Sequence, residues 1–188
     1  MKKLLLIALL ALNLQGCIFV AGAAAGAAAI AIVNDKRSVQ SVLQDKNIAN
    51  TATDNLKADP DFRDAHISVT SFNRIVLMTG EVSTADLRQR AETIVQAIPN
   101  IAHIYNEIQV KGSASTLSVA NDAWITAKIK TMMLANRDLR SSSIKVVTEG
   151  STVYLMGIVS HEQSNIASDI ARQVTGVEKV IRIFQYTD

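Results

Sequence analysis

The feature that most constrains the fold of this chain is an internal repeat, in which matching residues lie 77 positions apart. The matched pairs are Ile48 and Ile125, Ala52 and Ile129, Leu56 and Met133, Ile67 and Ile144, Val69 and Val146, Val76 and Val153, Gly80 and Gly157, and Val82 and Val159. One residue is then lost, so that Ile94 aligns with Ile170 and Ile104 with Val180. Because a repeat of fixed period marks copies of one structural unit, the sequence predicts two small domains rather than one large core.

Each copy predicts a helix, two strands, a second helix and a third strand. Apolar residues four apart mark the first helices, and alternation such as Ile67 and Val69 marks the first strands. The hairpin turns, helix starts and helix ends carry residues typical of those places. They are Asn73-Arg74 and Glu149-Gly150 for the turns, Ser83-x-x-Asp86 and Ser160-x-x-Gln163 for capping boxes, and Pro99-Asn100 and Thr175-Gly176 for the helix ends. The last strands are predicted over residues 104–110 and 180–186.

The order strand, helix, strand within each copy implies a crossover connection, which places both helices on one face of the sheet. We therefore predict an α+β protein with two tandem domains, each αββαβ, in which two helices cover one face of a three-stranded mixed sheet. The domains are predicted over residues 38–112 and 113–188, with a short Gly/Ser linker at residues 111–116. Each copy has only a modest core at about 70 residues, so docking of the copies on each other is an open alternative.

The N-terminus is typical of a lipoprotein signal peptide over residues 1–16. Lys2 and Lys3 precede an apolar run at residues 4–12 that is too short to span a ~30 Å hydrocarbon core. Leu14-Gln15-Gly16-Cys17 follows and resembles the lipobox of bacterial lipoproteins, which implies cleavage and acylation of Cys17, the single cysteine. The alternative is a free or buried thiol near an uncleaved anchor. Multiple acyl chains, at ~0.8 kcal/mol per buried CH₂, make such anchoring effectively permanent.

We interpret residues 17–37 as the acylated cysteine and an Ala/Gly-rich tether lying near the bilayer surface. The alternative is one uncleaved transmembrane helix over residues 4–33, in which Gly22 and Gly26 would form a helix contact. The polar Asn13 in mid-span argues against that alternative.

The charge of the mature chain is balanced. Of 19 basic side chains, Lys2 and Lys3 leave with the signal, so 17 remain against 17 acidic ones, and electrostatic function must come from local patches. Ile18 follows the acylated cysteine where an Asp would favour retention at the inner membrane, so resemblance to enterobacterial sorting favours the outer membrane.

The repeated unit resembles the BON domain, a module of bacterial periplasmic proteins that are osmotically induced or related to nodulation. The segments that carry the resemblance are Val76-Leu77-Met78-Thr79-Gly80-Glu81-Val82, Val153-Tyr154-Leu155-Met156-Gly157-Ile158-Val159 and Thr175-Gly176-Val177-Glu178-Lys179-Val180. The first copy departs from the last pattern, with Pro99-Asn100-Ile101, which leaves that turn's geometry open.

The lipobox and two such domains together are similar to the dual-BON outer-membrane lipoproteins that are associated with cell division and membrane stress. Asn121-Asp122-Ala123-Trp124-Ile125-Thr126 and Tyr105-Asn106-Glu107-Ile108 carry this resemblance, which covers nearly the whole chain. It implies a lipid-anchored protein of the outer membrane, facing the periplasm, that binds anionic phospholipid through its second BON domain and supports envelope integrity.

Differences between the two copies also favour the second copy as the lipid-binding one. Residues 122–141 hold four basic and two acidic side chains, whereas residues 45–64 hold three basic and five acidic ones. Basic residues contribute ~1 kcal/mol each at an anionic surface, and Trp is favoured at membrane interfaces. Polar Asn47 and Lys57 of the first copy become Trp124 and Leu134 in the second. The predicted lipid-binding residues are Trp124, Ala127, Lys128, Lys130, Thr131 and Leu134.

Other interpretations of this helix stay open. Trp124 can pack against the other domain while the lysines form an ordinary solvated face. Alternatively, the Trp124 face docks a protein, which would make the chain an adaptor for outer-membrane assembly or envelope quality-control factors. A purely structural spacer is a third alternative.

Nothing in the sequence favours an enzyme. His66, His103 and His161 do not recur between the copies and match no metal-ligand spacing. Acylation removes Cys17 as a nucleophile, and the chain has no G-x-S-x-G, P-loop or dinucleotide fingerprint. We therefore expect no cofactor and no metal, and a neutral mature chain predicts no nucleic-acid binding. The expected partners are anionic phospholipids such as phosphatidylglycerol or cardiolipin, with envelope proteins as the alternative.

Overall fold

The computed structural model describes residues 37–111 and 116–188. The predicted signal peptide, the lipidation of Cys17 and nearly all of the tether lie outside the described residues. Within the two described ranges, none of the helices combines the length and apolar character needed to cross a membrane.

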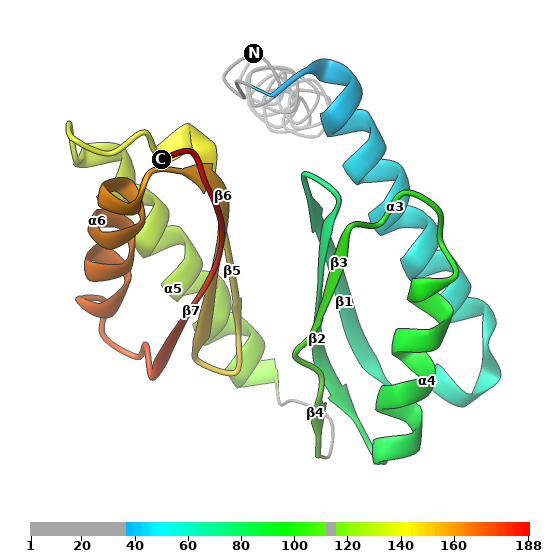
Figure 1. The fold of residues 1–188 in the computed structure, drawn as a ribbon. Coiled ribbons are helices and arrows are strands. Elements are labelled where there is room, and N and C mark those ends of the chain that lie inside the picture. The colour runs from blue at the N-terminus through cyan, green and yellow to red at the C-terminus, as the bar shows by residue number, and fades with distance from the viewer. Residues whose placement is uncertain (1–36, 112–115) are drawn as a thin grey trace, which may run out of the picture. The chain divides into compact units, whose positions relative to one another are not determined.

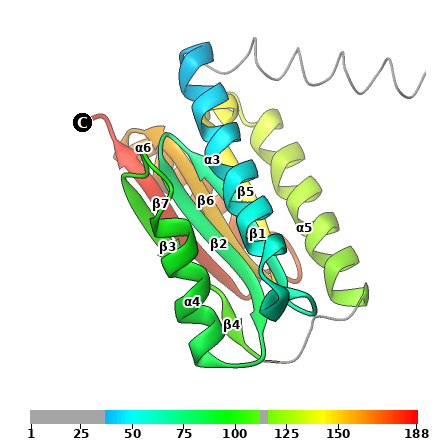
Figure 2. The same ribbon diagram turned by 90° about the vertical axis from the view of Figure 1, so that its right-hand side faces the viewer.

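The described chain contains two copies of one α+β unit, as the repeat predicts (Figure 1). The first copy consists of α3 (Val39–Ala58), η1 (Pro60–Phe62), β1 (His66–Phe72), β2 (Ile75–Val82), α4 (Ala85–Gln96), β3 (His103–Asn106) and β4 (Gln109–Val110). The second consists of α5 (Thr116–Ala135), η2 (Ser141–Ser143), β5 (Ile144–Glu149), β6 (Thr152–Val159), α6 (His161–Arg172) and β7 (Lys179–Tyr186). In both sheets the hairpin is antiparallel and the crossover strands are parallel, so the sheets are mixed. Figure 2 shows α3 and α4 in front of the first sheet.

The sheet of the first copy differs from the prediction, because the strand expected at residues 104–110 is interrupted. β3 ends at Asn106 and β4 begins at Gln109, and both pair with β2. The side chain of Asn106 accepts a hydrogen bond from the Ile108 N–H at 3.3 Å, which turns the chain and buries Ile108 in the core. The second copy lacks this break, and β7 runs unbroken alongside β6.

The helix caps agree with the prediction in one copy only. Ser160 caps α6 by accepting a hydrogen bond from the Gln163 N–H, as the capping box predicts. The expected cap at Ser83 is wrong, because Thr84 caps α4 by accepting from the Leu87 N–H. The two hydroxyl residues are adjacent, and the sequence pattern does not choose between them.

An aspartate near the start of each first helix holds the hairpin turn of its own copy. Asp45 accepts hydrogen bonds from the Asn73 and Arg74 N–H groups, and Asp122 accepts from the turn at residues 150–151. Both central residues of each turn have positive φ, as a two-residue type I′ hairpin requires. Asp45 and Asp122 are themselves 77 positions apart, so this clamp is part of the repeated unit.

Each copy buries its own apolar core between its helices and its sheet. α3 contributes Ile48, Ala52 and Leu56 to the first core, and α5 contributes the equivalent residues to the second. A third cluster joins the opposite faces of the two sheets, which therefore pack on each other. Its buried members are Phe72, Leu77, Tyr154, Met156 and Ile183. This cluster resolves the question of docking that the sequence leaves open.

Candidate functional site

The exposed face of α5 holds all the residues that the sequence predicts for a lipid-binding site. Ile125, Ile129 and Met133 are buried, so the opposite face of the helix points outward. Trp124 is 53% exposed and Leu134 is 75% exposed, which is unusual for side chains of this size. The other four predicted residues, Ala127, Lys128, Lys130 and Thr131, are also exposed.

These side chains are ordered around the helix. Trp124, Ala127, Thr131 and Leu134 follow the three- and four-residue spacing of one helical face, and we call them the α5 strip. At about 100° per residue, Lys128 lies on one flank of the strip and Lys130 on the other. The arrangement is an apolar and small-residue centre with a cation on each side. Neither lysine has an ion-pair partner among those identified in the described chain.

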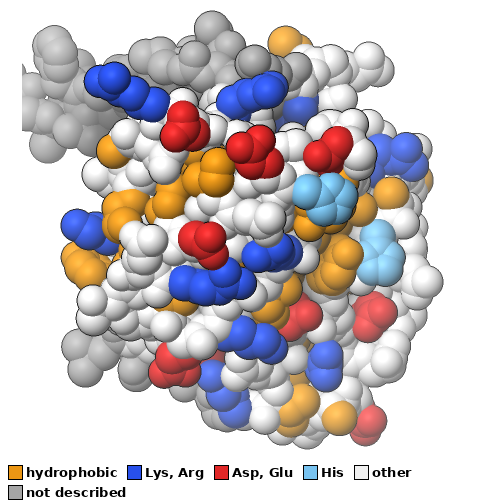
Figure 3. Space-filling model, turned by 60° about the vertical axis from the view of Figure 1, so that its left-hand side comes forward, with side chains coloured by type: hydrophobic (Ala, Val, Ile, Leu, Met, Phe, Trp, Pro, Cys, Tyr) orange, Lys and Arg blue, Asp and Glu red, His pale blue; other side chains and the backbone are white. Residues whose placement is uncertain are grey.

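The equivalent face of α3 has a different character. The α5 strip corresponds to Asn47, Asn50, Asp54 and Lys57, which are all polar, and the flanking lysines correspond to Thr51 and Thr53. The first copy therefore has the same scaffold without the exposed Trp and Leu and without the flanking cations. Figure 3 shows one face of the molecule on which apolar side chains are exposed among lysines, arginines and acidic residues, with no wide field of one sign.

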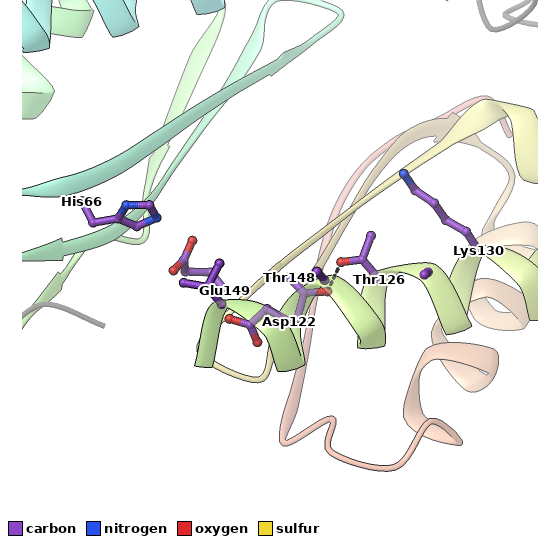
Figure 4. Close-up of a pocket in the computed structure, with 9 residues that line it drawn as sticks. His66, Asp122, Thr126, Lys130, Thr148 and Glu149 are labelled. Carbon is purple, nitrogen blue, oxygen red and sulfur yellow. Dashed lines mark hydrogen bonds between the residues drawn. The ribbon is translucent and has the colours of Figure 1, made fainter. Parts of the chain in front are cut away.

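A cavity of about 460 Å³ lies beside the α5 strip and was not predicted from the sequence. It is bounded by α5, the end of β5 and His66 of β1, as Figure 4 shows. Ala127 and Lys130 line it, while the other four predicted residues do not. Its residues come from both copies and do not recur together in the repeat, so no pattern in the sequence could bring them together.

The cavity holds a carboxyl group with shifted acidity. Burial raises the pKa of Glu149, and the nearby carboxylates of Glu81 and Asp122 act in the same direction. His66 and a hydrogen bond from Thr79 at 3.4 Å oppose this shift. Thr126 and Thr148 join their hydroxyls at 2.7 Å on the cavity wall. The cavity is lined by the Thr126 and Thr148 hydroxyls, by the cation of Lys130 and by the carboxyl group of Glu149, whose raised pKa makes it easier to protonate than an exposed glutamate.

The three histidines are not gathered in one place. His66 lines the cavity, His103 contacts Tyr105 edge-on, and His161 pairs with Asp188 and stacks on Tyr186. In the part of the chain that the structure describes, no group of three or more His, Cys, Asp or Glu residues is arranged to hold a metal ion.

Comparison with known proteins identifies the repeated unit. The BON domain family model matches residues 44–112 and 121–188. The outer membrane lipoprotein DolP of Haemophilus influenzae is 29% identical over 189 residues, covering 100% of this chain and 97% of that protein. A 21 kDa hemolysin of Actinobacillus pleuropneumoniae is 32% identical over 81% of this chain and 79% of its own length. The osmotically-inducible protein Y of Escherichia coli is 29% identical over 61% of this chain and 58% of its own.

Solved structures add little. The C-terminal domain of CdsD, from the type III secretion system of Chlamydia trachomatis, covers 75% of this chain and 67% of that one, with 11% identity and a TM-score of 0.28. A similarity at this level has no bearing on function.

Proposed function

Because this chain belongs to the BON-domain family and carries two copies of the domain, we propose that its second copy binds anionic phospholipid through α5 and so supports the integrity of the envelope. The chain is a lipoprotein of the outer membrane with two BON domains, and it is similar over its full length to an outer membrane lipoprotein. Its anchor, on this proposal, is the acylated Cys17, and its two domains face the periplasm. We propose a binding role and no catalytic one.

The observation that carries the proposal is the exposed α5 strip between two lysines. A helix with an exposed apolar stripe and basic flanks lies in the plane of a membrane interface, with the stripe buried ~5–10 Å into the headgroup region. The indole of Trp124 suits this depth because its ring is apolar while its N–H can stay hydrated. Lys128 and Lys130 would meet lipid phosphates on the two sides of the stripe. Phosphatidylglycerol and cardiolipin supply that charge.

Two-point attachment makes even a weak contact effective. The acyl anchor would hold the domains near the bilayer, so that binding by α5 becomes an intramolecular event at high effective concentration. A local difference in anionic lipid would then change how long α5 stays on the membrane. Enrichment of the protein at lipid-distinct regions, such as a division site, follows from this.

The test uses Trp124, which is the single tryptophan of the chain. Soluble residues 37–188 are titrated with zwitterionic vesicles that contain or lack phosphatidylglycerol or cardiolipin, and Trp emission is followed. We expect a blue shift only with anionic vesicles. Lys128→Glu and Lys130→Glu should each weaken binding by about 2 kcal/mol, roughly 30-fold, because an attraction of ~1 kcal/mol becomes a comparable repulsion. Lys57→Glu, on the equivalent face of α3, is the matched control and should bind as the unchanged protein does.

The rival function, a protein-interaction adaptor, uses the same exposed Trp124. Added salt separates the two, because headgroup attraction by exposed lysines is screened with a Debye length of ~8 Å at physiological ionic strength, whereas apolar docking is not. An emission spectrum that no vesicle changes, while the far-UV circular dichroism of the fold is retained, would refute lipid binding. Partner capture on the Trp124 face would then be the next step.

A further inference from the structure

Exposed large apolar side chains gather on the first helix of both copies, not only on α5. Seven such side chains are exposed in the described parts of the chain, and five of them lie on α3 or α5. On α3 they are Val39, which is 60% exposed, and Leu43, which is 52% exposed. These two residues are four positions apart and share one face of the first two turns. The proposed lipid site on α5 does not account for them.

The charges around Val39 and Leu43 are those of a surface that tolerates anionic lipid. Residues 38–44 carry no charged side chain. Asp45 is buried and bonded to Arg37 and to the hairpin turn, so its charge is already compensated. Lys46 is exposed, and the first exposed acidic residue of the helix is Asp54. The exposed surface of the N-terminal half of α3 is thus apolar and basic, and exposed acidic side chains begin only in its last two turns.

We propose that the N-terminal half of α3, through Val39, Leu43 and Lys46, rests on the bilayer that holds the acyl anchor. The occupant of this face is a lipid surface, and the first copy thereby supplies a membrane contact of its own. The proposal rests on anchoring through Cys17, but not on lipid binding by α5.

The chain outside the described residues argues for this occupant. Only residues 18–38 separate the proposed anchor from α3, and fully extended they reach at most ~71 Å at about 3.4 Å per residue. A tethered surface of this length is presented to its bilayer at an effective concentration in the millimolar range. Two exposed apolar side chains and one lysine make a weak contact, and such a contact is populated only under these conditions. The same apolar surface on a protein without an acyl anchor would dissociate from the membrane.

Arg37 fixes where the tether reaches the domain. Its guanidinium lies 3.8 Å from the centre of the Phe72 ring and bonds to Asp45, so the chain enters α3 at a defined place. Ser38 then caps the helix by accepting a hydrogen bond from the Ser41 N–H. Val39 and Leu43 follow at once. The first two turns of α3 are therefore the described part of the protein closest along the chain to the anchor.

The test places a fluorescent reporter on this face of the full acylated protein in vesicles. Trp124→Phe removes the native tryptophan, and Leu43→Trp then reports from the first turns of α3. Lys57→Trp in the same background is the matched control, because it lies on the same side of α3 but ~21 Å farther along at 1.5 Å per residue. The vesicles contain phosphatidylglycerol and phosphatidylcholine, with or without bromine on the acyl chains.

We expect brominated lipid to quench the Leu43→Trp reporter at least about twofold, as burial ~5–10 Å into the interface implies, and to leave the Lys57→Trp reporter nearly unchanged. Equal quenching of both reporters, or of neither, would overturn the proposal. A blue shift of the Leu43→Trp reporter without quenching would also overturn it, since residues 18–33 of the chain would then cover this face.

Two parallel measurements distinguish the contact on α3 from lipid binding by α5 and from anchoring through Cys17. Bromine quenching of Trp124 in the unchanged protein tests α5 alone, so its absence together with a quenched Leu43→Trp reporter would refute lipid binding by α5 and support the contact on α3. Cys17→Ala should release the protein from vesicles and abolish quenching of the Leu43→Trp reporter. Quenching that survives without the acyl chains would show that the contact does not depend on the tether, against the proposal.

Discussion

Leu77 and Tyr154 occupy equivalent positions in the two copies, and both are buried in the same cluster between the two sheets. Each lies on the central strand of its sheet, on the face turned away from its own helices. Burial, with smaller contributions from Glu107 and Glu149, raises the pKa of Tyr154 to about 12, so the side chain stays neutral in this cluster. The repeat therefore supplies a second apolar face from each copy, and these two faces join the domains.

The first prediction concerns the cooperativity of folding. Leu77→Ala should destabilise the protein by about 2–5 kcal/mol, because it removes buried methyl groups and leaves a cavity. Since the lost contacts belong to both copies, the whole protein should shift in one urea transition, followed by tyrosine and tryptophan signals together. Lys57→Ala, at an exposed position, should stay within about 0.5 kcal/mol. If the protein instead unfolds in two separate transitions, and Leu77→Ala lowers the urea midpoint of the first copy alone, the domains do not stabilise each other.

The second prediction concerns the glycine of β2. Gly80 has a φ of 116°, and a Cβ placed there would lie 1.8 Å from the carbonyl oxygen of His66. Gly80→Ala should therefore lower the free energy of unfolding by more than about 1 kcal/mol, through both strain and displacement of β1. Gly150 is the matched control, since its φ of 53° is accessible to Asn and the nearest atom, Lys111 Nζ, is 3.7 Å away. If Gly150→Asn lowers the free energy of unfolding as much as Gly80→Ala does, this account is contradicted.

The third prediction concerns pH. Burial raises the pKa of Glu149 above its unfolded value. The contribution of Glu149 to stability is therefore fully present below the unfolded pKa and is lost as pH rises through the folded pKa. Glu149→Gln should accordingly raise the urea midpoint relative to the unchanged protein at neutral pH, with the advantage shrinking towards about pH 3, where the carboxyl is protonated in both states. A difference in midpoint that is constant between these pH values would exclude the effect.

The sequence predicts the repeated fold because the physical signals recur twice. Apolar residues four apart fix the buried faces of α3 and α5. Asn73-Arg74 forms the first hairpin turn as predicted, whereas the second turn is Gly150-Ser151, one residue later than the predicted Glu149-Gly150, so that Glu149 ends β5. The departure at Pro99-Asn100 proves harmless, since Asn100 adopts a φ of 69° and Gly176 one of 89°, so both turns use the left-handed conformation. Asn tolerates the left-handed conformation, so the turn of the first copy keeps the backbone geometry of the second although its sequence departs from the Gly-Val pattern.

Other features could not be predicted, because they depend either on single hydrogen bonds or on the packing of two whole sheets. The break between β3 and β4 depends on one hydrogen bond that the Asn106 side chain accepts. Which of the adjacent Ser83 and Thr84 caps α4 depends on one further hydrogen bond, from the Leu87 N–H to the Thr84 hydroxyl. The exposure of the α5 strip follows from helical periodicity and could be predicted. The cavity beside it could not, because His66 and Glu149 come from different copies, and their approach depends on the packing of two whole sheets.

The last prediction tests the apolar part of the α5 strip separately from its lysines. Leu134 is the most exposed large apolar side chain described, and its equivalent in the first copy is the charged Lys57. Leu134→Asp should leave the free energy of unfolding within about 0.5 kcal/mol, since the side chain makes few contacts in the fold. It should nevertheless weaken binding to phosphatidylglycerol vesicles by at least about 2 kcal/mol, because burial of the leucine side chain in the interface is lost and a like charge is added. Sedimentation of residues 37–188 with vesicles measures the binding, and Lys57→Asp is the control that changes the matching place on α3. Lys57→Asp lowers the net charge by two units and Leu134→Asp by one, so a loss of binding in Lys57→Asp that is at least as large as that in Leu134→Asp would mean that net charge alone governs association, and the α5 strip would then have no specific part in it.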